Sequence, residues 1–327
     1  MKILFADTLY AQYMPEIRKA VAEDAEWCVA SPSDPLALEQ EIADADIFVG
    51  SKLPASLVAG AKALKLVVCS ASGTNGIAID ALPEHVAVTN TYHHEQSISE
   101  YVMMSVVALS RGLLQADSAL RQGRWRSVFY DSSRRPHHVL AGQTIGLIGL
   151  GHMGTAVAKL AKAFGMRVIA TRRNAAAGEV SEAVDEVRGS DQLAWLLQEA
   201  RFVVVCAPLT SETRDLLGPA QLRLIGPDGF LINVGRAEIV NEEALFQSLL
   251  TRVIAGAAVD VWYNYPDKVD GVREPSSFPF RELDNIIMTP HHSGQAEENF
   301  RARAGDIAYN IGAFLSGKSL RNTVSRK

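Results

Sequence analysis

Short apolar runs alternate along the chain with longer segments in which apolar residues recur every three or four positions. A short apolar run bounded by small or polar residues is typical of a strand buried on both faces of a parallel sheet. A repeat of three to four residues indicates a helix with one apolar side. In the first part of the chain the pattern predicts strands at Lys2–Phe5, Trp27–Ala30, Ile47–Val49, Leu66–Cys69 and Val86–Thr89, with helices at Tyr10–Ala22, Pro35–Ala43 and Pro54–Ala63.

The same alternation returns later in the chain. It predicts a helix at Met153–Phe164 and strands at Thr144–Ile148, Arg167–Thr171, Phe202–Cys206, Phe230–Val234, Ala255–Val259 and Ile286–Met288. A long helical pattern, Ile98–Arg121, precedes this series, and another, Ala296–Leu315, follows it. The last helix has no other apparent partner, so we expect it to cover the N-terminal domain. The predicted fold class is α/β, with residues 1–98 and 293–327 in one domain and 99–292 in the other.

Composition narrows the class of protein. A length of 327 residues suggests two domains, and 48% hydrophobic with 21% charged residues is ordinary for a globular protein. The net charge of −5 and the lack of a basic tract argue against nucleic acid or membrane as partners. The start of the chain reads as a strand and not as a signal peptide, and the three cysteines show no metal-ligand spacing. We therefore expect a cytoplasmic protein without a metal site.

The stretch Thr144–Arg173 carries the clearest chemical signal. Gly149, Gly151 and Gly154 form a G-x-G-x-x-G between a predicted strand and a predicted helix. In a dinucleotide-binding unit the first glycine permits a tight turn, the second lets the backbone approach a pyrophosphate, and the third allows close packing of the helix. The helix N-terminus then faces the phosphates. The strand, turn, helix and second strand follow in the order that such a unit needs, so the sequence predicts dinucleotide binding.

The end of the second strand of this unit bears on the choice of cofactor. An acidic residue there holds the ribose hydroxyls of NAD, but this chain has Arg172 and Arg173, with no carboxylate from residue 167 to 178. A guanidinium pairs well with phosphate oxygens, so we expect NADP to be favoured, with NAD possible. The alternative is that one arginine stacks on adenine while the other is solvated.

Polar residues at the ends of other predicted strands could carry chemistry. Arg236, Asp260 and His291 each follow an apolar strand, and the carboxyl ends of parallel strands line the ligand crevice. Singly, each has a structural explanation as a helix-end charge, a cap or a loop histidine; together they indicate an active site. The polar loop 70–76 after the fourth strand could hold a carboxylate through its backbone N–H groups, or could be an ordinary turn.

These motifs resemble the D-isomer-specific 2-hydroxyacid dehydrogenase family over essentially the whole chain. The resemblance is carried by the glycine motif, by the segments 206–213, 233–236, 260–262 and 289–291, and by the tail 317–322. It implies two Rossmann-like, doubly wound parallel-sheet domains with a cleft between them. It also implies a homodimer whose contact lies at about residues 100–142.

The resemblance assigns roles by position. Arg236 would bind the carboxylate of a 2-oxo acid and polarise its carbonyl, while His291 would exchange a proton with the carbonyl oxygen. Ser72 and Gly73 would bind the substrate carboxylate, Asp260 would hold the nicotinamide carboxamide, and Ser97 and Ile98 would border the nicotinamide. The other expected cofactor-binding residues are Gly149, Gly151, His152, Met153, Gly154, Arg172, Arg173, Ala207, Pro208, Thr213, Val234, Gly235 and Ser293.

One departure from the family concerns the partner of His291. The family places a glutamate five residues after the position of Asp260, and this chain has Tyr265 there; Glu274, before Pro275, is the alternative partner if the segment contains an insertion. We prefer Tyr265 because the alignment then needs no gap. A phenol can orient an imidazole but carries no charge at neutral pH. We therefore expect His291 to titrate near its ordinary pKa of about 6.5, and reduction to slow above that pH.

The resemblance implies an NAD(P)-dependent oxidoreductase that transfers a hydride between nicotinamide and a small 2-oxo or D-2-hydroxy acid, such as glyoxylate or hydroxypyruvate. The missing glutamate leaves open a dinucleotide-binding regulatory protein, similar to the family's corepressors, with weak or no turnover. A dehydrogenase of an unusual acid is a further alternative. Neither the acid nor the physiological direction follows from the sequence.

Overall fold

The chain folds into two units, one made from both ends of the sequence and one from its middle. We describe a computed structural model in which residues 1–21, 25–175, 180–266 and 271–325 are placed. Unit 1 comprises residues 1–93 and 295–327, and unit 2 comprises residues 94–294. The expected boundary at 98/99 lies instead before the helix that begins at Glu95, so Ser97 and Ile98 belong to unit 2.

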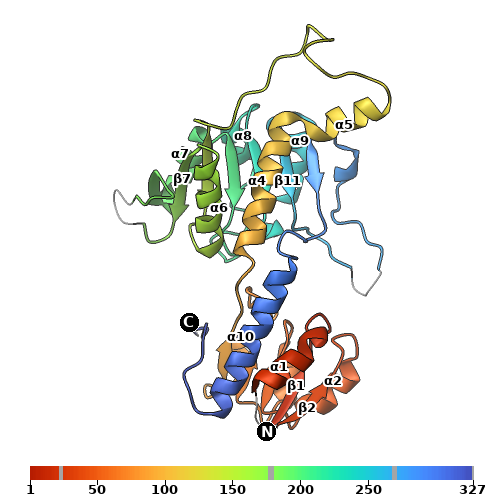
Figure 1. Ribbon diagram of the computed structural model, residues 1–327, viewed down its shortest axis with the longest axis vertical. Helices are drawn as coiled ribbons and strands as arrows, with labels where there is room; N and C mark the ends of the chain where they lie inside the picture. The colour runs from red at the N-terminus through yellow and green to blue at the C-terminus, as the bar shows by residue number, and fades with distance from the viewer. Residues whose placement is uncertain (22–24, 176–179, 267–270, 326–327) are drawn as a thin grey trace. The chain divides into compact units, whose positions relative to one another are not determined.

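Unit 1 is a five-stranded parallel sheet with helices on both faces. The strand order is β2-β1-β3-β4-β5. Helices α2 and α3 pack on one face, whereas α1 and the C-terminal helix α10 pack side by side on the other (Figure 1). The strands are β1 (Lys2–Phe5), β2 (Glu26–Val29), β3 (Ile47–Val49), β4 (Leu66–Val68) and β5 (Ala87–Thr89), and the helices are α1 (Met14–Val21), α2 (Pro35–Ile42), α3 (Ala55–Gly60) and α10 (Glu297–Leu315).

Unit 2 is a seven-stranded parallel sheet, ordered β12-β11-β10-β9-β6-β7-β8. Helices α4 and α6 cover one face, and α7, α8 and α9 cover the other (Figure 1). The strands are β6 (Thr144–Ile148), β7 (Arg167–Arg172), β8 (Glu186–Gly189), β9 (Phe202–Val205), β10 (Phe230–Asn233), β11 (Gly256–Val259) and β12 (Ile286–Met288). The helices are α4 (Glu95–Arg111), α5 (Leu113–Arg121), α6 (His152–Ala163), α7 (Leu193–Glu199), α8 (Pro219–Ile225) and α9 (Glu242–Leu250).

The predicted fold class, two doubly wound parallel sheets, is confirmed, and the structure corrects two details. The single helix expected over 98–121 is broken at Gly112, whose φ of +59° is left-handed and ends α4. The edge strand β8 was not predicted, because Glu186 and Arg188 interrupt its apolar pattern. The expected end of the first helix at Ala22 lies outside the described residues. Of the three cysteines, only Cys69 is fully buried.

The order of the strands locates the ligand-binding edge of unit 2. Strand β6 lies between β7 and β9. From β7 the chain continues outward to β8 on one side of the sheet, and from β9 it continues outward to β10 on the other side. At such a switch point the loops at the carboxyl ends of the strands separate and leave a crevice. The glycine turn follows β6 directly, and the loops after β9, β10, β11 and β12 end at the same edge.

Candidate active site

The glycine turn has the geometry that a dinucleotide requires. Gly149 has a φ of +99°, which disfavours any residue with a side chain. A Cβ on Gly154 would lie 2.3 Å from the carbonyl oxygen of Gly149, so α6 packs directly on the turn. A Cβ on Gly151 would meet nothing within 4 Å. That open space lies at the N-cap of α6, next to the exposed His152 and the half-buried Met153, where the first N–H groups of a helix can receive a pyrophosphate.

Loops from two neighbouring strands complete this edge. A Cβ on Gly149 would lie 2.9 Å from Ala207 N, and a Cβ on Gly235 would lie 3.0 Å from Ala207 O, so the turns after β6, β9 and β10 pack together. The turn after β9 is closed by Thr213, whose hydroxyl donates to Pro208 O at 2.7 Å. The buried Val234 leads into the turn after β10. The residues present therefore fit a bound dinucleotide.

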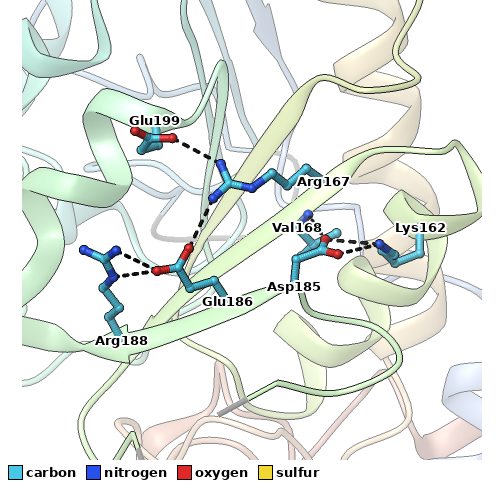
Figure 2. Close-up of polar contacts among 7 residues, drawn as sticks. All are labelled: Lys162, Arg167, Val168, Asp185, Glu186, Arg188 and Glu199. Atoms are coloured by element: carbon cyan, nitrogen blue, oxygen red, sulfur yellow. Dashed lines mark hydrogen bonds and ion pairs between the residues drawn. The ribbon is translucent and has the colours of Figure 1, made fainter. Parts of the chain in front are cut away.

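Arg172 and Arg173 stand at the carboxyl end of β7, whereas Asp185, which precedes β8, and Glu186, which begins it, lie towards the other end. In the strand register Ile169 pairs with Glu186, and Arg172 pairs with Gly189. Figure 2 shows that these carboxylates are engaged elsewhere: Asp185 with Lys162 at 2.9 Å, and Glu186 with Arg167 at 3.2 Å. Glu186 also contacts Arg188 at 2.6 Å. Asp185 and Glu186 thus form their ion pairs towards the amino end of β7. Arg172 and Arg173 lie at the carboxyl end of that strand, on the edge of the sheet that carries the glycine turn.

The imidazole of His291 contacts Tyr265, and Glu274 lies elsewhere. The Tyr265 hydroxyl is 3.0 Å from His291 Nδ1 and also accepts a hydrogen bond from Trp262 N at 3.1 Å. The carboxylate of Glu274 instead pairs with Arg281. The segment that follows β11 therefore brings the phenol to the histidine, at the position where the family has its glutamate.

Asp260 lies at the centre of the loop that carries His291. It is fully buried, and its Oδ1 accepts from Thr289 Oγ1 at 2.7 Å and from His292 N at 3.0 Å, while its Oδ2 accepts from Ser293 N at 3.0 Å. His291, between these contacts, has a φ of +56°, a conformation that costs energy in a residue with a side chain. The Asp260 carboxylate therefore stabilises a strained loop, in addition to any contact with a cofactor.

Helix α4 supports the same loop from the other side. Ser97 donates its hydroxyl proton to Ser293 O at 2.6 Å, and Tyr101 OH lies 2.7 Å from Thr289 Oγ1. Ile98 is buried and would be 3.8 Å from a Cβ placed on Gly294. Ser97, Ile98, Asp260 and Ser293, which are far apart in the sequence, are thus brought together.

Charges around His291 change its titration. Partial burial lowers the pKa of the imidazole below 6.5, the negative charge of Asp260 raises it, and the positive charge of Arg236 lowers it again. The expectation of an ordinary pKa is therefore wrong, because that expectation ignored burial and the arginine. Burial also raises the pKa of Tyr265 above 10, although Arg236 and the Trp262 N–H oppose the increase. Both groups are neutral at pH 7.

Unit 1 presents the expected loop after β4. Asn90 Nδ2 donates to Ser72 O at 2.7 Å, and Cys69 Sγ lies 3.8 Å from Gly73 O. In a trans peptide the C=O and the next N–H point in opposite directions, so the Gly73 N–H points away from Asn90. Below the loop, Ser70 donates to Asp7 Oδ2 in a short hydrogen bond. This arrangement holds the backbone of the loop in one orientation.

Sequence reasoning missed several supporting residues. Asn233 accepts from Gly235 N at 3.1 Å and donates to Arg236 O at 3.1 Å, which fixes the turn that carries the arginine. Thr289 links Asp260 to Tyr101, and Asn90 holds the loop of unit 1. A polar residue at the last position of a buried strand was the available signal for Asn233. The contacts of Thr289 and Asn90 join segments that are distant in sequence, so no local pattern indicated them.

The described residues hold neither a cluster suited to a metal ion nor a helix suited to span a membrane. Among them, no group of three or more His, Cys, Asp and Glu side chains is placed to hold a metal ion. Within the same residues, each helix is too short or too polar to cross a membrane.

Comparison with known proteins gives consistent matches. Residues 103–293 match the model of the D-isomer specific 2-hydroxyacid dehydrogenase NAD binding domain. The chain is 31% identical to D-3-phosphoglycerate dehydrogenase of Methanocaldococcus jannaschii, over 99% of this chain but 59% of that protein. It is 32% identical to glyoxylate reductase of Thermococcus gammatolerans, over 86% of this chain and 83% of that one.

A solved structure extends the match to both units. The NADPH-dependent glyoxylate/hydroxypyruvate reductase of Sinorhizobium meliloti, in complex with citrate, aligns with a TM-score of 0.80 and 25% identity, over 99% of this chain and 97% of that one. The chain thus has nearly the length of the reductases, whereas it spans 59% of the phosphoglycerate dehydrogenase.

Proposed function

The chain belongs to the D-isomer-specific 2-hydroxyacid dehydrogenase family, and from that premise we propose that it reduces a small 2-oxo acid, of the glyoxylate or hydroxypyruvate type, with NADPH. The observation that carries the proposal is the convergence of Arg236, Asp260, Tyr265 and His291 at the edge of the sheet that also bears the glycine turn. The relatives named glyoxylate reductase and glyoxylate/hydroxypyruvate reductase support this class of substrate.

The residues of unit 2 divide the work of the reaction. A bound nicotinamide supplies the hydride. The Arg236 guanidinium attracts the substrate carboxylate and stabilises negative charge on the carbonyl oxygen as that charge develops. His291 donates a hydrogen bond, and then a proton, to this oxygen. In unit 1, the loop that contains Ser72 and Gly73 carries backbone N–H groups of the kind that can bind a carboxylate.

The preference for NADPH rests on the end of β7. Arg172 and Arg173 offer two guanidinium groups where NAD-binding units place a carboxylate, and the acids of β8 pair at the opposite end of the strand (Figure 2). A phosphate on the adenosine ribose would gain charge-assisted hydrogen bonds there. NADH would lack these contacts.

We also propose a homodimer formed through the segment 100–142. Large apolar side chains are exposed along this part of the chain, and most of them lie on α5 or in the segment after it. They are Met104, Leu113, Leu114, Leu120, Trp125, Val128, Phe129, Tyr130 and Val139. A run of exposed apolar side chains on one segment favours burial against another chain. Beside α5 lie hollows of about 300 and 380 Å³, lined in part by Leu114, Arg126 and Ile286, into which such side chains could fit.

The function is tested with a panel of 2-oxo acids and both reduced cofactors. We expect oxidation of NADPH with glyoxylate or hydroxypyruvate, at a kcat/KM at least tenfold above that with NADH. The Arg236→Gln protein should bind NADPH normally but lose most of its turnover. Tight NADPH binding without turnover on any acid of the panel would favour the regulatory, dinucleotide-binding alternative.

A further inference from the structure

The hydroxyl of Tyr265 has two hydrogen-bond partners in the described part of the chain, Trp262 N and His291 Nδ1. A backbone N–H can only donate, so the hydrogen bond of 3.1 Å from Trp262 N to the phenolic oxygen occupies an acceptor position of that oxygen. A tyrosine has a single proton to donate. Among the described residues, His291 Nδ1, at 3.0 Å, is the acceptor within reach of that proton, and we infer that Tyr265 donates and the imidazole accepts.

This direction selects one form of His291. When Nδ1 accepts, a neutral imidazole carries its proton on Nε2. An imidazolium would instead donate from Nδ1, and the phenolic oxygen would then receive two N–H donors while its own proton lost its acceptor. The Arg236 charge also opposes the imidazolium, whereas Asp260 favours it. A glutamate in place of Tyr265 would have the opposite effect, because a carboxylate can only accept.

Resting on the proposed function, we propose that Tyr265 is the proton source of the reduction and that neutral His291 relays its proton to the substrate. As the carbonyl carbon gains hydride, the N–H bond at Nε2 breaks and an O–H bond forms on the substrate oxygen. At the same time the O–H bond of Tyr265 breaks and an N–H bond forms at Nδ1. The imidazole stays neutral throughout, and the product is the 2-hydroxy acid with a phenolate at Tyr265.

The greater acidity of a phenol compared with an alcohol favours the relay. A phenol, with an ordinary pKa of about 10, is a much stronger acid than an alcohol, which resembles water at about 15.7, so the transfer to the substrate alkoxide is downhill. Burial raises the pKa of Tyr265 and disfavours the phenolate, as do the charges of Asp260 and Glu238, whereas the Trp262 N–H and the Arg236 charge stabilise it. The site resets when a proton from water reaches Nε2 and Nδ1 returns its proton to the phenolate.

The relay predicts an unusual pH profile for reduction. If imidazolium were the donor, kcat/KM would fall about tenfold per pH unit above a His291 pKa that already lies below 6.5. With the relay, kcat/KM stays level from pH 7 to pH 9, because both the phenol and the neutral imidazole persist there. Two protons also move in one step, so kcat/KM measured in mixtures of H₂O and D₂O curves downward against the deuterium fraction.

Three variants test the relay against a structural role for the tyrosine. Tyr265→Phe removes the proton source but keeps the ring, so reduction should fall at least tenfold at pH 8, decline steadily with rising pH, and show a linear dependence on deuterium fraction. Tyr265→Glu should restore activity at pH 7, because imidazolium then acts as the proton donor. The decline of reduction with pH should begin at a higher pH, and kcat/KM should again depend linearly on the deuterium fraction. Tyr263→Phe is the matched control, since within the described part of the chain the Tyr263 hydroxyl bonds the backbone carbonyl of Val240 and not His291, and this variant should keep the native profile.

The outcomes separate this proposal from the proposed function. A native protein that reduces 2-oxo acids but loses activity tenfold per pH unit above 6.5 overturns the relay alone, as does a Tyr265→Phe protein with the native pH profile. A native protein that binds NADPH and reduces no acid overturns the proposed function. A level native profile that becomes sloped in Tyr265→Phe, with the curved isotope dependence becoming linear, supports both.

Discussion

The carboxylate of Asp260 accepts a hydrogen bond from the backbone N–H of Ser293 at 3.0 Å, across 33 residues of sequence. Its other oxygen accepts from His292 N, so this one buried side chain determines where the backbone on the carboxyl side of His291 lies. His291 has a left-handed φ, which needs support from its surroundings. The position of the imidazole is therefore a consequence of the residue at the end of β11.

The first prediction follows from that arrangement. In Asp260→Asn one oxygen becomes an NH₂ group, which cannot accept from a backbone N–H, so a buried donor loses its partner. We expect the free energy of unfolding to fall by about 1–3 kcal/mol and turnover to fall with it. Urea unfolding and steady-state kinetics measure both. Glu243→Gln, an exposed change of the same kind on α9, is the control, and equal stability of the two variants would contradict the argument.

The second prediction concerns the arginine pair. Arg172→Asp should shift the ratio of kcat/KM for NADPH to that for NADH by tenfold or more towards NADH, since a charge-assisted hydrogen bond contributes about 1.5–3 kcal/mol. Arg223→Asp makes the same change of charge at an exposed position on α8 and should leave the ratio unchanged. Equal kcat/KM for the two cofactors in the native protein would refute the preference.

The third prediction is the cost of losing the imidazole. His291→Ala should lower turnover by roughly 10²–10⁴, the usual contribution of a positioned acid–base group, while the Kd for NADPH stays the same. Added imidazole should restore part of the activity, because the Tyr265 hydroxyl remains available to a small base. A fully active His291→Ala protein would exclude His291 from the reaction.

The parts of the site that the sequence predicts are those that single short segments encode. The glycine turn, with Gly149 at a positive φ and Gly154 packed on it, is specified by adjacent residues and the flanking apolar runs. The charged groups at strand ends were also predictable, because parallel strands have all their carboxyl ends at one edge of the sheet. By contrast, the contacts of Asp260 with residues 289–293 join distant segments, and no local pattern records them.

The direction of the bond between Tyr265 and His291 was similarly out of reach. It depends on a third group, the Trp262 N–H, and on how the loop after β11 bends back on itself. The pKa of His291 was mispredicted for the same reason: burial and the nearness of Arg236 appear only in three dimensions. The sequence could name Tyr265 as the partner of the histidine but could not show which atom donates.

The fourth prediction concerns the reverse reaction. Oxidation of the 2-hydroxy acid by the relay requires a phenolate at Tyr265, and the pKa of this group is raised above 10. Since the deprotonated form grows tenfold per pH unit below that pKa, we expect the oxidation rate to rise about tenfold per unit from pH 7 to pH 9. Initial rates with NADP⁺ at fixed pH values measure this. In Tyr265→Glu the oxidation rate should stop increasing at a lower pH than in the native protein. A native oxidation rate that is level from pH 7 to pH 9 would contradict the relay.

The last prediction addresses assembly. Phe129 is 88% exposed, on a segment where Trp125 and Tyr130 are also largely exposed, and burying such a side chain contributes about 1.5–3 kcal/mol. If these rings contact a second chain, Phe129→Glu places a charge in an apolar interface, and the protein should become monomeric by light scattering after size-exclusion chromatography. Leu36→Glu, at an apolar position of unit 1 that is 72% exposed, should leave the dimer intact. A native protein that is monomeric at micromolar concentration, or a Phe129→Glu protein that remains dimeric, would show that this segment is not the interface.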